Sequence, residues 1–502
     1  MPSLRFRTSC FKALGTGCEV GRSRPLVPSF SALTTSLPPL KKGGVPFSEV
    51  RGGWGLVRGG WWLRFALFLV TGYLLLFFPL PLPAAEQAAD AAERAQFEHY
   101  QGQPIVAIRF EGNRVTREIV LREELVLHEG EPFDAEKALK SRQYLRNLGL
   151  FKQVTLAVRE VPGGVALTYR LEEKWYLLPI PRLGVNSDAD VSYGGELRWD
   201  NAFGLNQRFR MILEDTRRFN GEQVRDRHLE YIIPKIPGTR FGIGIATSGG
   251  RVETRRTSKD DNGVELGLYE QQSDQFRIGV SRWLKRIGPS HGWRLGSSVS
   301  AVHDEYRVVR DNPELPEESR RVTLGMGVDF TTRNDHELFR TGEEYGLGFG
   351  FGRRNLGSDH NYYDLSAYWR RYNHLPQLRR SNLNWQLRLG YNMGDENAYQ
   401  LGGGSSMRGL VREDVRGDVY ALLNLNWLVP LFGHDSFRGV LFTDIGNAWP
   451  RGKVDPTRWE YTVGAGFRWK IRSLVRISLR ADVGYDPATG DYKAYGGTNY
   501  MF

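Results

Sequence analysis

Few residues of this chain occur in spacings that enzymes use for catalysis. The sequence has no His-Glu-x-x-His motif, no Gly-x-Ser-x-Gly motif and no P-loop. In GIGIATSGG (242–250) and GLGFGFG (346–352) glycine alternates with other residues as in strands, without a following helix that would bind phosphate. A phospholipase would need a serine, a histidine and a polar third partner, which the nine histidines leave open as a remote alternative. We therefore expect no enzyme, no cofactor and no metal site.

One arginine attracts attention because a flexible glycine run precedes it. The stretch GGGSSMRGL ends in Met407, Arg408, Gly409 and Leu410, and segments that alternate apolar and polar residues flank it. Most loops of this kind are simply solvated, so Arg408 could lie in water. It could also be the tip of a loop that bends back into its own fold. The structure formed by the segments on either side of this loop distinguishes between these two interpretations.

The positive charge of the chain belongs mostly to its N-terminal part. The formal net charge is +11, but ten Lys or Arg precede Phe65 against only Glu19 and Glu49, which leaves about +3 for the rest. The net charge of the residues after the leader is therefore too small to indicate binding to nucleic acid. Both cysteines, Cys10 and Cys18, also lie in this part, so no disulfide framework would stabilise an exported product.

Residues 1–85 are predicted to be a leader with a signal peptide. Basic residues precede an apolar core at about 65–80, and a proline-rich stretch with Ala84 and Ala85 follows it at once. A retained membrane anchor is the alternative, because the apolar stretch approaches the roughly 20 residues that span a bilayer. Cleavage after Ala85 would leave 86–102 as a linker.

Residues 103–174 mix the periodicity of strands with that of helices. PIVAIRFEG, QVTLAVREV and VALTYRLEE alternate as strands, and a Pro-Gly-Gly turn joins the last two. Between the first two strands, Thr116 is expected to cap one helix and Asp134 a second, with Gly149 at the end of the second helix. The predicted order is strand, helix, helix, strand, strand, which describes a small α+β domain.

From residue 175 to 502 the helical periodicity disappears and two-residue alternation replaces it. In LNWQLRLGYN (383–392) apolar and aromatic side chains share one face, and polar side chains and glycine share the other. The polar faces carry charges such as Arg468 and Asp482 among glycines, which is expected of a wet interior, whereas a soluble sandwich would turn them outward. The strands last about ten residues, near the length of a tilted transmembrane strand. From Leu177 onward we count about 16 strands, and we predict an antiparallel membrane β-barrel over 175–502.

Several motifs together resemble one family. Residues 103–174 resemble a POTRA domain in FEGN, in a helix that ends NLGLF and in a strand that ends in glutamate. The loop resembles the inward-folding loop of the BamA and TamA family, whose motif is Val-Arg-Gly followed by Phe or Tyr. Here Met407 and Leu410 replace the flanking residues and keep apolar character. The later FTDIGNAW matches the family's Phe-x-Asp-x-Gly strand at Phe442, Asp444 and Gly446, and GAGFRW follows with Arg468.

The resemblance implies roles for particular residues. In the family, the loop arginine reaches into the barrel lumen and pairs with the aspartate of that strand, which implies that Arg408 pairs with Asp444. Loss of one partner of a shielded charge pair could cost on the order of 3 to 5 kcal/mol. Phe442, Gly446 and Arg468 are expected on the barrel wall beside this pair. Tyr500 and Phe502 resemble the C-terminal signal of outer-membrane proteins.

A further expectation concerns the seam where the first and last strands meet. Pro179 and Pro181 lack amide donors, and Gly496 and Gly497 pack poorly and permit a bend, so pairing there should be weak. Prolines and glycines of this kind can also simply mark strand ends. Members of the family are thought to open at this seam to template incoming strands.

The resemblance implies a protein of the surface-antigen type in the outer membrane of a Gram-negative-type bacterium, with its POTRA domain in the periplasm. It would assist insertion, assembly or translocation of other polypeptides. Its partners would be outer-membrane lipids, unfolded client polypeptides and periplasmic accessory proteins reached through the POTRA domain. A dedicated secretion pore and a passive channel are the alternatives. A single POTRA domain implies a specialised or reduced member.

Overall fold

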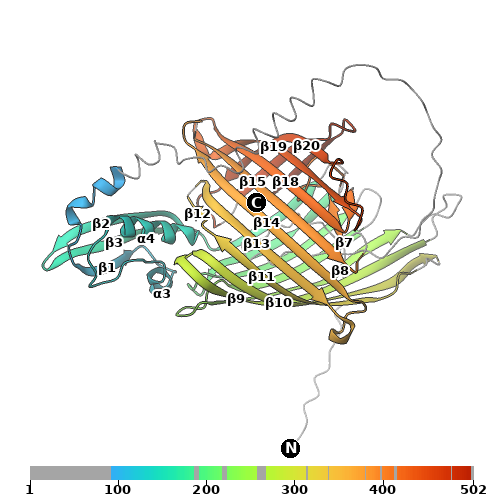
Figure 1. The fold of residues 1–502 in the computed structure, drawn as a ribbon, viewed down its shortest axis with the longest axis horizontal. Helices are drawn as coiled ribbons and strands as arrows, with labels where there is room; N and C mark the ends of the chain where they lie inside the picture. Colours follow the sequence, from blue (N-terminus) through green and yellow to red (C-terminus); the bar gives the residue numbers. More distant parts are fainter. Residues whose placement is uncertain are drawn as a thin grey trace, which may run out of the picture.

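The computed structural model shows a small α+β domain followed by a closed β-barrel (Figure 1). It describes residues 92–185, 191–217, 223–256, 267–311, 315–336, 338–378, 380–395, 398–411, 415–475 and 478–498. The expected leader with its signal peptide, and the C-terminal residues Tyr500 and Phe502, lie outside the described residues. Within them, no helix is long and apolar enough to cross a membrane.

The α+β domain has the order of elements that the sequence predicts. Its elements are a 3-10 helix η1 (Glu98–Tyr100), β1 (Ile105–Glu111), α3 (Glu118–Arg122), α4 (Ala135–Asn147), β2 (Phe151–Val161) and β3 (Gly164–Glu173). The sheet order is β1-β3-β2, with β1 parallel and β2 antiparallel to β3. Alternate residues of the strands pack against the helices, and Val475 from a barrel turn completes this core.

One of the two predicted helix caps is confirmed and the other is wrong. The Asp134 side chain accepts a hydrogen bond from the backbone N of Lys137 at 3.0 Å and caps α4. The N-cap residue of α3 is Arg117, which makes no side-chain cap bond. Thr116 is buried, and its backbone N donates instead to Oε1 of Glu173 at 2.8 Å. The carboxylate of Glu173, at the end of β3, therefore accepts hydrogen bonds from the backbone N of Arg114, Val115 and Thr116, which precede α3.

The barrel is an antiparallel meander. Its strands are β4 (Leu177–Val185), β5 (Val191–Ala202), β6 (Gln207–Arg217), β7 (Gln223–Ile233), β8 (Phe241–Arg256), β9 (Gly267–Gly288), β10 (His291–Asp311), β11 (Ser319–Thr331), β12 (Asn334–Asp335), β13 (Arg340–Gly352), β14 (Tyr362–Leu375), β15 (Ser381–Met393), β18 (Val419–Leu431), β19 (His434–Trp449), β20 (Glu460–Lys470), β21 (Ser478–Tyr485) and β22 (Tyr492–Thr498). Each long strand pairs with its sequence neighbour, and β22 lies beside β4 to close the ring. Because β12 is a two-residue strand in the β11–β13 turn, the described wall consists of 16 long strands, which confirms the predicted number.

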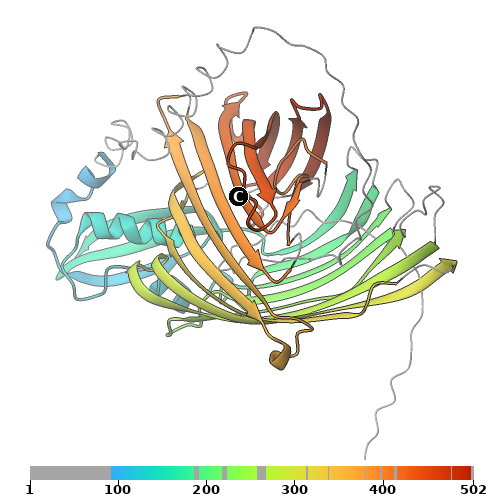
Figure 2. The ribbon, with the colours of Figure 1, turned by 45° about the vertical axis from the view of Figure 1, so that its right-hand side comes forward.

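The strands differ in length far more than the sequence suggested. β9 and β10 have 22 and 21 residues, whereas β21 and β22 have 8 and 7. A uniform length of about ten residues is therefore wrong on the β8–β10 side, which extends further than the rest of the wall (Figure 2). Register pairs of β10 with β11 stop at Asp304, and 305–311 pair with β9 alone. The β9–β10 hairpin therefore continues beyond the last residue that β10 pairs with β11.

The α+β domain rests on one end of the barrel through α4. Asn147 Oδ1 accepts a hydrogen bond from the backbone N of Asp335 at 2.9 Å, and its Nδ2 donates to Asn334 Oδ1 at 3.0 Å. One turn earlier, Tyr144 leaves no room for a side chain at Gly288, where a Cβ would lie 2.1 Å from the tyrosine oxygen. The C-terminal end of α4 therefore docks on the β9–β10 and β11–β13 turns.

A second contact joins the α3 region to the next turns of the rim. The backbone N of Arg117 donates to the carbonyl of Gly204 at 2.9 Å, and Glu123 pairs with Lys235 Nζ at 2.8 Å. Trp175 adds a backbone bond of 2.9 Å to the carbonyl of Ser473 in the β20–β21 turn. Beside this contact, burial raises the pKa of Glu124 to about 7, although the barrel cations Lys235 and Arg286 lower it and Glu123 raises it.

Candidate functional site: a loop held inside the barrel

The glycine run lies in the connection between β15 and β18, as the sequence predicts. A short pair of strands, β16 (Tyr399–Leu401) and β17 (Val415–Gly417), forms the base of this connection. Gly402, Gly403 and Gly409 have φ values of +124°, +75° and +117°, which favour glycine. The glycines therefore let the chain reverse sharply on both sides of the SSMR segment.

Arg408 lies at the tip of this loop and is bound to Asp444 on β19. Its Nε donates to Asp444 Oδ2 at 2.8 Å, its Nη2 donates to Oδ1 at 2.8 Å, and its backbone N donates to Oδ2 at 2.9 Å. Both side chains have an exposed fraction of 0%. This is the bidentate geometry that arginine makes with a carboxylate, and it excludes a solvated position for Arg408.

Neighbouring strands complete the contacts of the pair. The guanidinium carbon of Arg408 lies 3.6 Å from the ring centroid of Phe442, so the cation rests on the aromatic face. Asn424 on β18 donates through Nδ2 to Asp444 Oδ1 and to the Ser406 carbonyl, both at 2.8 Å. No sequence motif indicates Asn424, although it lies on the polar face of an alternating strand.

A second carboxylate, Asp482 on β21, explains the place of Arg468. Arg408 Nη1 lies 3.7 Å from Asp482 Oδ2, and Arg468 Nη2 donates to the same oxygen at 3.0 Å. Arg468 therefore belongs to the site through Asp482. Arg480 also approaches Asp482 at 4.0 Å and donates to the Gly404 carbonyl at 2.8 Å. Three arginines thus surround the two aspartates, and Arg408 and Arg468 are the two whose side chains are buried with them.

The two positions that depart from the family motif are apolar contacts. Met407 and Leu410 have exposed fractions of 0% and 4%, and they pack in a cluster with Leu401, Leu422 and Ala448. The Tyr495 hydroxyl on β22 accepts from the Gly409 N and donates to the Leu410 carbonyl, both at 3.2 Å. The loop tip thus contacts the last strand without an aromatic residue of its own.

Two wall glycines make room at the site. A Cβ at Gly484 would lie 2.5 Å from the carbonyl oxygen of Arg408, so the loop backbone presses on this position. A Cβ at Gly446 would lie 2.9 Å from the Leu422 side chain. Gly446 therefore serves the packing of the wall and makes no described contact with Arg408.

The predicted seam residues lie on neighbouring strands. Pro179 and Pro181 face outward on β4, and Gly496 and Gly497 lie on β22 beside it. A Cβ at either glycine would meet nothing within 4 Å. Weak pairing at this seam stays a prediction.

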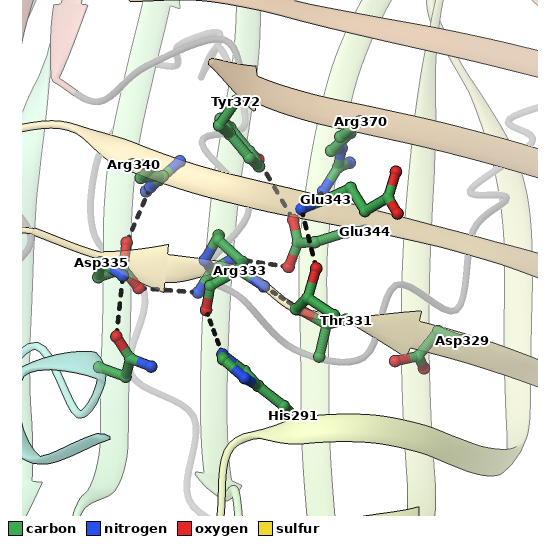
Figure 3. A network of polar contacts seen from close by, with 12 residues as sticks. His291, Asp329, Thr331, Arg333, Asp335, Arg340, Glu343, Glu344, Arg370 and Tyr372 are labelled. Atoms are coloured by element: carbon green, nitrogen blue, oxygen red, sulfur yellow. Dashed lines mark hydrogen bonds and ion pairs between the residues drawn. The ribbon is translucent and has the colours of Figure 1, made fainter. Parts of the chain in front are cut away.

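A polar network links the docked POTRA domain to the wall (Figure 3). Asp335, whose backbone binds α4, accepts hydrogen bonds from Arg333 and Arg340 at 3.0 Å each. Arg333 also donates to Glu344 at 2.8 Å, and Tyr372 on β14 donates to Glu344 at 3.2 Å. No sequence motif indicates this network, whose members lie in the β11–β13 turn, on β13 and on β14. Among the described residues, no group of three or more His, Cys, Asp or Glu side chains could hold a metal ion.

Comparisons with known proteins agree with this architecture. The model of the Omp85 superfamily domain matches residues 201–486, and the POTRA model, described as surface antigen variable number repeat, matches residues 104–174. CdiB from Escherichia coli is similar with 16% identity and a TM-score of 0.53, covering 80% of this chain and 77% of that one. CdiB from Acinetobacter baumannii is similar with 15% identity and a TM-score of 0.52, and the match covers 78% of this chain and 73% of that one. BamA from Haemophilus ducreyi lacking POTRA domains 1–3 is similar with 17% identity and a TM-score of 0.46, and the match covers 79% of this chain and 84% of that one.

At these identities the two CdiB structures indicate a shared fold. The superfamily model carries more weight, because it covers over half of the chain and includes the loop, Asp444 and Asp482. The POTRA match precedes it in the order that the structure shows. This chain therefore belongs to the Omp85 superfamily.

Proposed function

We propose that this protein assists the insertion, assembly or translocation of other polypeptides at the outer membrane, without chemistry of its own. The observation that carries the proposal is the Arg408–Asp444 pair. It fixes a long loop to the inner wall of a barrel that bears a POTRA domain at its rim. Such a pair is a structural clamp, because an arginine with a bidentate carboxylate has no free lone pair to offer as a base.

The POTRA domain is the proposed site for client polypeptides and periplasmic accessory proteins. β1 and β2 are the edge strands of its three-stranded sheet. An extended segment can add to such an edge through main-chain hydrogen bonds, which tolerate many side-chain sequences. In this proposal the domain lies in the periplasm of a Gram-negative-type bacterium and the barrel lies in its outer membrane.

The seam is the proposed site of release into the bilayer. Pro179 and Pro181 cannot donate ladder hydrogen bonds, and Gly496 and Gly497 add no packing on the facing strand. Incoming strands would exchange with a seam that is already poorly held. Outer-membrane lipids are therefore partners of the same site.

Depletion of the protein followed by quantitation of the outer-membrane proteome tests the proposal. We expect several other barrel proteins to decline together. Loss of one secreted polypeptide alone would identify a dedicated secretion pore instead. Unchanged levels of every other barrel, with altered permeability to small solutes, would replace the proposal with a passive channel.

A further inference from the structure

The β18–β19 turn has an unusual residue for its backbone conformation. Phe432 and Gly433 connect the strands, and their φ values are +55° and +73°. A two-residue hairpin with both φ values positive is a turn in which asparagine or glycine is preferred at the first position. A bulky residue in this region carries backbone strain.

The phenyl group of Phe432 makes few contacts within the protein that could offset this backbone strain. Phe432 is 84% exposed, which is the highest value among the large apolar side chains of the described residues. Its nearest aromatic neighbour is Phe437, at 6.0 Å between ring centroids. Among the described residues, neither the POTRA domain nor another turn covers it, since it remains 84% exposed and the POTRA contacts described above lie at other turns. An asparagine would suit the fold better, so the benefit of phenylalanine lies outside the chain.

The turn continues an aromatic surface on the outer face of the barrel. Phe437 stacks on Phe467 with 5.4 Å between ring centroids, and Phe437 lies opposite Trp469 in the β19–β20 register. Phe467 and Trp469 are 39% and 46% exposed. They lie on the face opposite to Arg468, which points into the lumen. Phe432 therefore extends the lipid-facing band by one residue beyond the end of the strands.

We infer that the β18–β19 turn is a membrane anchor whose Phe432 inserts into the inner-leaflet boundary between headgroups and acyl chains. Aromatic side chains favour this boundary, and continuity with the lipid-facing band places the ring at its level. Arg472 in the adjacent β20–β21 turn is exposed and can face lipid phosphates. The anchored hairpin also carries Asn424 and Asp444, so the wall that binds the loop is fixed relative to the bilayer. This inference requires only that the barrel lies in a membrane.

Site-specific fluorescence tests the anchor directly. The full chain has two cysteines, so Cys10→Ser and Cys18→Ser give a background for single labels. Phe432→Cys carries an environment-sensitive fluorophore, and Pro162→Cys on the exposed β2–β3 turn of the POTRA domain is the matched control. In vesicles of phosphatidylethanolamine and phosphatidylglycerol, brominated lipid should quench the label at 432, and aqueous iodide should quench the label at 162.

Quenching of the 432 label by iodide, to the extent seen at 162, would overturn the inference. A signal at 432 that appears only at high protein-to-lipid ratio would also overturn it, because it would assign the surface to a second copy of the chain. These outcomes do not depend on assembly activity.

A substitution separates anchoring from folding. Phe432→Asn creates the preferred residue for this turn, so the Tm in detergent should be equal or higher. The folded fraction that inserts into vesicles should fall about fivefold, the factor for losing roughly half of a buried phenyl group. Phe432→Trp should restore insertion. Equal insertion of the Asn variant and the native chain would contradict the anchor.

Discussion

At the scale of residues, the central feature is a cation that has no access to water. Arg408 has contacts with Asp444, Asp482 and Phe442, and it is the largest fully buried side chain of the described residues. Burial of such a cation is tolerated only while its partners remain. The loop should therefore be either fully seated or fully released.

Arg408→Ala tests the clamp. It leaves Asp444 buried without its cation, so we expect a loss of stability of about 3 to 5 kcal/mol. Loss of heat-resistant, folded-barrel mobility on gels would report this. Arg307→Ala is the control, because Arg307 pairs with Glu270 at the surface with its side chain 82% exposed. Normal folding and function of Arg408→Ala would refute the clamp.

Gly484→Ala should unseat the loop without removing any charge. The added methyl would lie 2.5 Å from the Arg408 carbonyl oxygen, so the loop must shift. Gly496→Ala provides the comparison, since a Cβ there meets nothing within 4 Å. Protease cleavage within 402–410 should increase in the first variant only. Equal protection in both variants would show that the loop does not rest on β21.

At the scale of elements, α4 connects the POTRA domain to the barrel. Asn147→Ala removes its hydrogen bonds to Asn334, Asp335 and Ser290. Hydrogen exchange across 135–147 should become faster, because this helix loses support at its docked end. Gln153→Ala, on β2 away from this contact, should leave exchange unchanged. Unaltered exchange in the Asn147 variant would mean that packing at Gly288 alone holds the helix.

The end of α3 should make the POTRA domain sensitive to pH. Burial raises the pKa of Glu124 from its ordinary 4.5 to about 7, so the folded domain binds this proton more tightly than the unfolded chain. Stability is then greatest below about pH 4.5 and falls until about pH 7, by roughly 3 kcal/mol at most. Urea midpoints from pulse proteolysis should show this decline. Glu124→Gln should abolish it, and a persistent decline would assign it to another group.

The sequence predicted most elements because their periodicity is local. The number of long strands, the Asp134 cap and the long β15–β18 connection follow from alternation and turn residues. Thr116 failed as a cap because its partner, Glu173, is far away in sequence. In the site, Asp444 followed from a motif, whereas Asp482 and Asn424 did not, since pairing across strands is invisible in one strand. The docking of α4 was missed for the same reason.

At the scale of the whole molecule, the inner and outer faces of the barrel wall have different roles. Its inner face binds the loop through charges, and its outer face presents aromatic and aliphatic side chains to lipid. The POTRA domain holds one part of the rim, and we place the Phe432 anchor on another. A barrel held at both points would transmit a movement of the POTRA domain to its wall.

The unequal lengths of the strands also bear on which part of the barrel is accessible from outside the cell. β9 and β10 are about three times as long as β22, so the outer rim is oblique and rises to a ridge on the β8–β10 side. If the POTRA domain lies in the periplasm, as proposed, we expect antibodies, bacteriophages and shaving proteases to reach this ridge from outside the cell. Within the described wall, its segment 305–311 has an open edge, because it pairs with β9 alone.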